Sequence, residues 1–200
     1  MLIPRCQRVL TYLGVLLTIL CSLGISLAHA ETATLMHGSL SLSEPGESPG
    51  LFANTSYEFD IPDELQKALR RGIALYFVHE IRVNKNRWYW LDRKVLDSKT
   101  ILRLSFNPIT RRYRVVTNGL SFEYDSLNQA LPFIKNLHHW RISDYNPIGN
   151  PQKYTVESRF YLDNTKLPKP MQVTSTSSDD WSISSDWSEL PIPTHFSNED

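Results

Sequence analysis

The sequence is poor in the residues that most often carry recognisable chemistry. Its 200 residues include two cysteines, Cys6 and Cys21, and both lie near the amino terminus. From Glu31 onward there is no thiol for a disulfide, a nucleophile or a metal ligand. Stability must therefore come from a hydrophobic core. A chain of this length can supply one, because folding buries about two-thirds of its unfolded surface.

Catalytic motifs are missing as well. The sequence contains no HExxH zinc motif, no GxSxG nucleophile elbow, no SxxK pair and no glycine-rich phosphate loop. His79 lies on the otherwise apolar side of a predicted strand, where a buried, hydrogen-bonded histidine is expected. His138 and His139 are adjacent, so a strand would point them to opposite faces. We therefore predict no metal site, no cofactor and no catalytic residue.

The first 30 residues have the pattern of an export signal. Arg5 and Arg8 precede a long apolar run, and Ala28, His29 and Ala30 offer the small residues that a signal peptidase recognises. We predict a cleaved signal peptide over residues 1–30, a periplasmic mature protein and no membrane span after cleavage. An uncleaved inner-membrane anchor is the alternative. Export without cysteines is typical of a bacterial periplasm rather than of a disulfide-rich secreted module.

Alternating apolar residues predict many short strands after the signal. The predicted strands cover residues 40–42, 51–59, 73–83, 88–91, 102–106, 113–117, 120–124, 140–142 and 154–162, with a last strand within 173–187. This density predicts one mainly β domain over residues 31–188. It is an antiparallel β-sandwich, immunoglobulin-like in general architecture, with two short helices. A small β-barrel is the alternative. Residues 189–200 are predicted to be a disordered acidic tail.

Two helices have recognisable ends. In the first, Asp60 is the predicted N-cap, and Gly72 stops the helix after a basic last turn. In the second, Ser126 and Gln129 form a predicted capping box. Pro132 lies inside this second helix and is expected to shorten, kink or split it.

Two turns and a connection complete the prediction. Asn118 and Gly119 both tolerate positive φ, so they predict a tight type I′ hairpin. A second turn is predicted at residues 84–86, which would fold residues 88–91 back beside the preceding strand. Residues 94–99 are then interpreted as a polar connection between strands.

Charge is unevenly distributed along the chain. Residues 61–114 contain 13 Lys and Arg against 5 Asp and Glu. This basic region is either a solvated face or a surface for an anionic partner. After export such a partner would be lipid headgroups, an envelope polymer or an acidic protein, and not nucleic acid. Five residues are the predicted binding residues: Arg87, Trp88, Arg111, Arg112 and Arg114.

Five segments together carry a family resemblance. They are FDIPDELQKALRRGIALYF, RWYW, RLSFNPITRRYRV, LDNTKLPKPMQV and DWSISSDW, within residues 59–187. The set resembles an uncharacterised family of exported proteobacterial proteins, the domain of unknown function numbered forty-three ninety, whose members are labelled proline-rich signal peptide proteins. The resemblance implies an envelope location and an accessory role in envelope sensing. It implies no enzyme activity and no catalytic residue.

Two functions from different classes follow. The first is a non-catalytic periplasmic or envelope protein, a binding or accessory module for an envelope protein or an anionic envelope surface. The second is an enzyme that acts on envelope glycan or lipid. It would use carboxylates that folding brings together, such as Glu80, Glu157 or Asp163. Converging carboxylates with raised pKa values would favour the enzyme.

Overall fold

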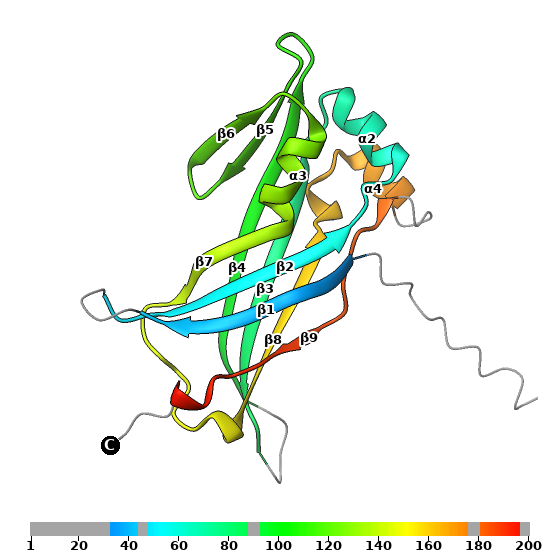
Figure 1. Ribbon diagram of the computed structural model, residues 1–200. Helices are drawn as coiled ribbons and strands as arrows, with labels where there is room; N and C mark the ends of the chain where they lie inside the picture. The colour runs from blue at the N-terminus through cyan, green and yellow to red at the C-terminus, as the bar shows by residue number, and fades with distance from the viewer. Residues whose placement is uncertain (1–32, 44–47, 88–92, 176–180, 197–200) are drawn as a thin grey trace, which may run out of the picture. The chain divides into compact units, whose positions relative to one another are not determined.

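The computed structural model of the chain describes residues 33–43, 48–87, 93–175 and 181–196, all within the unit of residues 31–200. The described residues form two antiparallel sheets (Figure 1). The three-stranded sheet has the order β1-β2-β7, with β1 (Ala33–Leu42), β2 (Leu51–Phe59) and β7 (Asn136–Ser143). The six-stranded sheet has the order β6-β5-β4-β3-β8-β9, with β3 (Leu75–Lys85), β4 (Arg93–Asn107), β5 (Arg112–Thr117), β6 (Leu120–Tyr124), β8 (Tyr154–Leu162) and β9 (Ser188–Leu190).

Short helices lie toward the two ends of these strands. The α-helices are α2 (Asp63–Arg70), α3 (Leu127–Lys135) and α4 (Lys169–Ser175), in the upper part of Figure 1. The 3₁₀ turns η1 (Pro151–Lys153) and η4 (Thr194–Phe196) lie in the lower part, whereas η2 (Asn164–Lys166) precedes α4. The two predicted helices are thus present as α2 and α3, and α4 was not anticipated.

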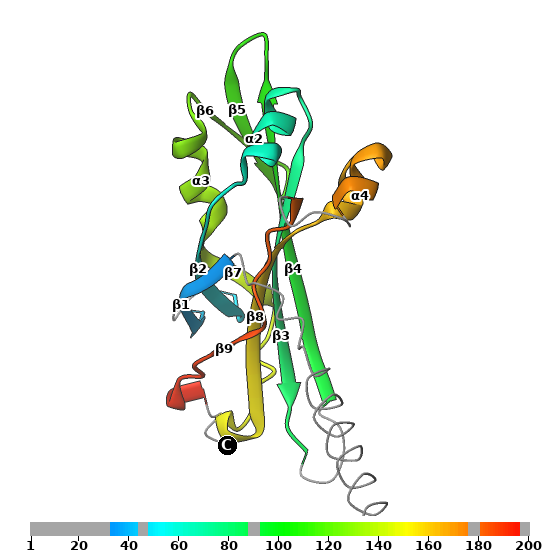
Figure 2. The same cartoon turned by 90° about the vertical axis from the view of Figure 1, so that its right-hand side faces the viewer.

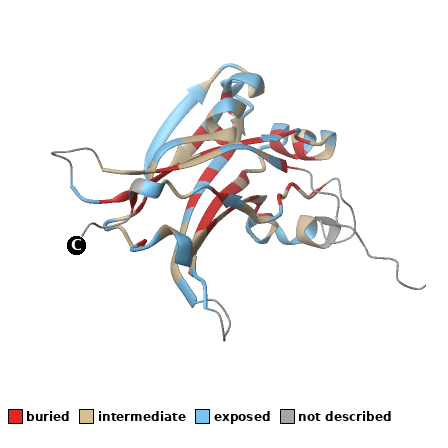
Figure 3. Cartoon of the chain, turned by 60° about the horizontal axis from the view of Figure 1, so that its bottom comes forward, coloured by how far each residue is buried: buried red, intermediate tan, exposed pale blue. Residues whose placement is uncertain are grey.

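The two sheets meet through apolar faces. In β2 the rings of Tyr57 and Phe59 stack on Phe160 of β8, with centroid distances of 5.3 and 4.8 Å. Figure 3 shows the buried residues running along the strands where the sheets meet. The predicted mainly β, antiparallel sandwich is confirmed. The small-barrel alternative is wrong, because the strands form two separate sheets that do not close.

The end of the chain contributes to the core. Leu190 of β9 and Phe196 of η4 are each 1% exposed and belong to an apolar cluster between the two sheets. Leu190 packs directly over Gly38 of β1, where a Cβ atom would collide with it. The structure therefore differs from the prediction of a disordered tail beginning at residue 189. Two large apolar side chains are enough to fix this segment against existing strands.

The hairpin of β3 and β4 is longer than predicted. Lys85 still pairs with Arg93, so the turn predicted at residues 84–86 is wrong. The predicted polar connection at 94–99 is also wrong, because these residues belong to β4. The charged side chains of these residues lie at alternate positions on the outer face of the sheet. They made the strand difficult to recognise in the sequence. The strand predicted at residues 88–91 lies outside the described residues.

The tight turn between β5 and β6 is confirmed. Asn118 and Gly119 have φ values of 47° and 79°, so both central residues adopt the left-handed conformation of a type I′ turn. Apart from Gly119 itself and its two chain neighbours, no atom of the described residues lies within 4 Å of the position that a Cβ of Gly119 would take. Backbone conformation rather than crowding therefore selects glycine here.

The helix ends were partly predicted. The Oγ of Ser126 accepts a hydrogen bond from the amide of Gln129, which confirms the cap of α3. Pro132 is tolerated inside α3, which ends three residues later at Lys135. The cap of α2 was assigned wrongly to Asp60. Pro62 occupies the N-cap position without a side-chain cap, and its carbonyl accepts from Gln66.

The segment before β9 differs from the single strand that we predicted. Residues 169–175 form α4, because Pro170 sits in its first turn, where a missing amide donor costs nothing. Residues 181–187 contribute an isolated bridge between Ser184 and Tyr161. The amide of Ala33 also donates to Ser184. This segment thus joins β1 of one sheet to β8 of the other.

Candidate functional site

A histidine lies at the centre of the core. The Nε2 of His79 is 2.8 Å from the carbonyl oxygen of Ile134, and Nδ1 is 3.3 Å from Oγ1 of Thr55. Because a carbonyl can only accept, Nε2 carries the proton and Nδ1 accepts from the hydroxyl. Burial lowers the pKa of His79 to about 4, so the ring is neutral at pH 7. The prediction of a buried, hydrogen-bonded histidine is confirmed.

Glu80, the first carboxylate of the enzyme alternative, is held by two cations. Its oxygens lie 2.7 Å from Nη2 of Arg159 and 3.0 Å from Nζ of Lys99. Burial raises the pKa of Glu80, but the hydrogen bonds and charges of Arg159 and Lys99 outweigh it and hold the pKa below its usual value. Glu80 is therefore ionised, whereas a general acid requires a raised pKa.

The other two carboxylates are also engaged. Oε2 of Glu157 accepts hydrogen bonds from Nε of Arg82 at 2.9 Å and Nδ2 of Asn84 at 3.0 Å. Asp163 caps η2, with its Oδ1 3.1 Å from the amide nitrogen of Thr165. Each of the three carboxylates named for the enzyme alternative thus makes bonds that hold strands or turns together.

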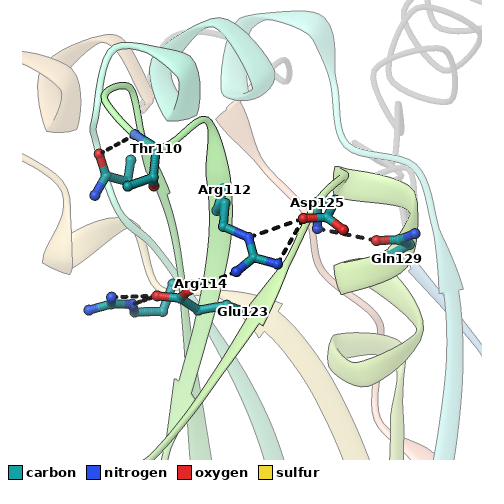
Figure 4. A network of polar contacts seen from close by, with 7 residues as sticks. Thr110, Arg112, Arg114, Glu123, Asp125 and Gln129 are labelled. Carbon is teal, nitrogen blue, oxygen red and sulfur yellow. Dashed lines mark hydrogen bonds and ion pairs between the residues drawn. The ribbon is translucent and has the colours of Figure 1, made fainter.

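Two of the predicted binding arginines are neutralised by acids on and after β6 (Figure 4). Arg112 donates to Oδ1 of Asp125 from Nε at 3.0 Å and from Nη2 at 2.9 Å. Arg114 donates to Oε1 of Glu123, with Nη2 at 2.6 Å. The hydrogen bond and charge of Arg114 lower the pKa of Glu123. We call these four residues the paired cluster.

Arg111 and Arg87, two further predicted binding residues, lie at opposite ends of β4. Arg111 lies in the turn between β4 and β5 with a positive φ of 55° and is exposed. Arg87 is exposed and follows β3, at the opposite end of β4. Trp88 lies outside the described residues. The structure therefore does not bring the four described residues together, and the role of all five in binding stays a prediction.

A cavity lies at the end of β4 where Arg87 is found. Its volume is about 320 Å³, and six residues line it: Lys85, Arg93, Lys94, Val95, Tyr145 and Tyr154. We call these residues the basic pocket. The ends of β3, β4 and β8, which supply five of the six, run together at the bottom of Figure 2. Tyr145 follows β7 and is 58% exposed.

Strand pairing fixes the walls of the basic pocket. Lys85 pairs with Arg93 on one side and with Tyr154 on the other. The end of β3 is held further by Asn86, whose amide donates to the carbonyl of Lys153 at 2.8 Å. Nζ of Lys85 lies 5.7 Å from the centre of the Tyr154 ring, within range of a cation–π contact. The cations thus lie on paired strands, next to a register irregularity between Val83 and Asn84.

The basic pocket carries excess positive charge. Lys94 forms an ion pair with Asp97, with Nζ and Oδ2 2.7 Å apart. Lys85 and Arg93 have no acidic partner among the residues that the structure describes. Among the described residues, three cations against one carboxylate give this concave surface a local charge near +2, which favours binding of an anion.

Sequence reasoning named none of these six residues as part of a binding site. It assigned Lys94 to a connection and ended β3 too early, so Lys85 and Arg93 were not placed opposite each other. Asn84 and Lys85 are both polar, so the apolar alternation of β3 stops at Val83 and gives no signal that the strand continues. Nothing in the sequence placed Tyr145 beside them, because it comes from a distant connection.

No group of three or more His, Cys, Asp or Glu side chains is positioned to hold a metal ion among the residues that the structure describes. Within the same residues, no helix has the length and apolar character needed to span a bilayer.

Comparison with known proteins gives one match. A family model described as Domain of unknown function (DUF4390) matches residues 43–191. This range contains all six residues of the basic pocket and all four of the paired cluster. No curated protein and no solved structure matches the chain.

Proposed function

Because the chain belongs to the DUF4390 family, whose description assigns no activity, we propose its function from the basic pocket. The protein is a non-catalytic module of the bacterial envelope that binds an anionic partner there. The observation that carries the proposal is the gathering of Lys85, Arg93 and Lys94 around one cavity, with a single acidic partner among the described residues. Cations left unpaired in a concave site favour a ligand of opposite charge.

The proposed location is the periplasm, with residues 1–30 as a cleaved signal peptide. The basic start, apolar run and small residues before Glu31 support this location. The mass of the protein recovered by osmotic release tests it, with Glu31 as the expected first residue. An intact amino terminus that sediments with membranes would favour the inner-membrane anchor.

The proposed partner is an envelope protein or an anionic envelope surface, in an accessory role linked to envelope sensing.

The state of the carboxylates supports a binding function over an enzyme. Glu80 has a lowered pKa, and Glu157 and Asp163 are engaged in hydrogen bonds within the fold. A glycosidase-type mechanism requires two carboxylates that are free to act on the substrate. Binding through cations requires neither.

The test measures binding of the purified full chain to a defined polyanion, fluorescent polyglutamate, and retention of envelope extract. The pocket variant is Lys85→Glu with Arg93→Glu, which reverses the two charges that have no acidic partner within the described ranges. Arg103→Glu is the matched control, because Arg103 is exposed on β4 but outside the pocket. We expect the pocket variant to lose at least about tenfold in affinity and the control less than about twofold.

Salt and the second basic region complete the test. Binding should weaken as salt rises, because exposed charges are screened within about 8 Å at physiological ionic strength. Reversal of Arg111, Arg112 and Arg114 tests the sequence prediction separately, with circular dichroism as the folding control. The proposal is overturned if the folded pocket variant binds both probes as well as the wild type does.

A further inference from the structure

We infer that the basic pocket binds a phosphate monoester attached to a small polar group, carried by a lipid headgroup or by a soluble molecule. This inference rests on the proposed function and identifies the chemistry of the anion. Three observations carry it: an unfavourable pairing of charges across β3 and β4, the charge of the cavity, and the mixed character of its walls.

The pairing of charges along the β3–β4 hairpin changes at the pocket. Higher on the hairpin, opposite charges face each other, because Glu80 pairs with Lys99 and Arg82 pairs with Asp97. At the pocket, Lys85 instead pairs with Arg93, so like charges meet. Like charges directly opposite each other destabilise a sheet. We expect an arrangement that lowers stability to be retained beside a cavity when a bound ligand compensates for the lost stability.

Phosphate fits the number and type of donors. A phosphate monoester carries a charge of about −1.5 to −2 at pH 7 and three acceptor oxygens. Counted over the described part of the chain, the three cations of the pocket, less the charge of Asp97 beside Lys94, give a local charge near +2. The planar guanidinium of Arg93 can bind two phosphate oxygens at once, and the flanking ammonium groups act as point charges. A carboxylate, with one charge and two oxygens, would leave part of this positive charge unpaired.

The rest of the cavity suits the organic part of the ligand. A volume of about 320 Å³ lies at the lower end of the range for small-molecule sites and exceeds what a bare phosphate fills. Tyr145, Tyr154 and Val95 supply ring faces, two hydroxyl groups and one apolar contact. Such a wall accommodates a glycerol- or sugar-sized polar group. It does not require an acyl chain inside the pocket.

The test uses three probes that separate the sources. Glycerol 3-phosphate is the soluble ester. Vesicles of phosphatidylcholine with one-fifth phosphatidic acid present the same monoester on a lipid, and vesicles of equal charge with phosphatidylglycerol present a diester. Inorganic phosphate tests whether the organic part contributes. Calorimetry measures the soluble ligands, and flotation measures the vesicles, with the purified full chain.

Two variants of one arginine and a matched control decide the outcome. We expect Arg93→Gln to weaken glycerol 3-phosphate binding at least about tenfold, because a charge-assisted bidentate contact is lost. Arg93→Lys should retain more affinity than Arg93→Gln, because it keeps the charge but not the planar fork. Arg103→Gln, on the same strand outside the pocket, should bind within about twofold of the wild type. Circular dichroism confirms that all three are folded.

Preference for phosphatidic acid over phosphatidylglycerol vesicles, lost in Arg93→Gln, would identify a lipid source. Binding of glycerol 3-phosphate without vesicle binding would identify a soluble source. The inference is overturned if neither ester binds, or if Arg93→Gln and Arg103→Gln bind equally. If polyglutamate binding still depends on Lys85 and Arg93 in that case, the proposed function stands and the pocket takes another anion.

Discussion

Basic side chains gather at both ends of β4, and the two groups differ in what lies opposite them. In the paired cluster, Arg112 and Arg114 meet Asp125 and Glu123. In the basic pocket, Lys85 meets Arg93. The first arrangement satisfies its own charges within the fold. The second leaves positive charge directed into a cavity.

The comparison shows that a high density of basic residues in the sequence does not reveal which of their side chains remain available to a ligand after folding. Both groups belong to the same basic region of residues 61–114, and only folding brings acids from β6 against one of them. The two groups are also independent. Arg114 pairs with Ser105, twelve residues along β4 from Arg93, or about 40 Å away. Charges at that distance are screened from each other in physiological salt.

The prediction with the largest expected effect concerns the dependence of stability on pH. It sets the pH range in which the basic pocket and the paired cluster can be compared. Unfolded His79 gains a proton near pH 6.5, whereas the folded ring stays neutral until about pH 4. The unfolded state therefore binds more protons across this window, and stability falls as pH decreases through it. We expect a loss of roughly 3 kcal/mol between pH 6.5 and pH 4. Urea unfolding at several pH values measures it.

The control for this prediction is a second histidine. His79→Gln should flatten the dependence of unfolding free energy on pH, whereas His138→Gln should leave it unchanged, because His138 is exposed. Equal slopes in wild type and His79→Gln would show that another group governs the acid range. The comparison of the two basic groups should accordingly be made above pH 6.5, where the scaffold is most stable.

A turn substitution should separate stability from binding. Gly119→Val forces a β-branched residue to a φ of 79° in the turn of the β5–β6 hairpin that carries the paired cluster, at a cost of about 1–3 kcal/mol. Gly149→Val is the matched control, because Gly149 has open space and no positive φ, and should change stability by less than about 0.5 kcal/mol. Polyglutamate binding, measured below the unfolding transition, should remain at the wild-type level. Weaker binding in folded Gly119→Val would mean that the two ends of β4 are coupled.

The next change makes the basic pocket resemble the paired cluster. Val95→Glu places a carboxylate among Lys85, Arg93 and Lys94 and should lower polyglutamate affinity about tenfold, or 1.4 kcal/mol. Val95→Gln has nearly the same size without the charge and serves as the control. Equal affinities of the two variants would show that shape rather than charge determines binding.

The smallest effect is expected from the converse change. Glu123→Gln removes the acid that neutralises Arg114 and should raise polyglutamate binding at low salt by up to about twofold. The gain should disappear at high salt. Glu64→Gln, an equal change of net charge on α2, is the control. A larger gain than that produced by Glu64→Gln identifies Glu123 as the group that masks these arginines.

The sequence was informative where a local pattern determines structure. The bounds of β2 and the Asn118-Gly119 turn follow from alternation and from positive φ, and both were predicted. The end of β3 was missed because Asn84 and Lys85 are polar on both faces of the strand. Helix α4 was missed because the prolines around Lys169 mask a helix start.

The basic pocket could not be predicted for a different reason. Its residues come from three strands and one connection, so no stretch of sequence contains them together. The acids that pair with Arg112 and Arg114 show the same limitation. Which carboxylate reaches which arginine depends on strand register, and one residue of slip moves every side chain to the other face.

The contact between Gly38 and Leu190 has a consequence for the order in which the chain can fold as it emerges from the ribosome. The first described strand is available at the start, but the side chain that covers it arrives at the end. Until then, one side of β1 has neither its apolar partner nor the bond from Ala33 to Ser184. A newly emerging chain therefore passes through a stage in which this side of β1 is uncovered. During that stage a chaperone or a neighbouring chain can bind to β1.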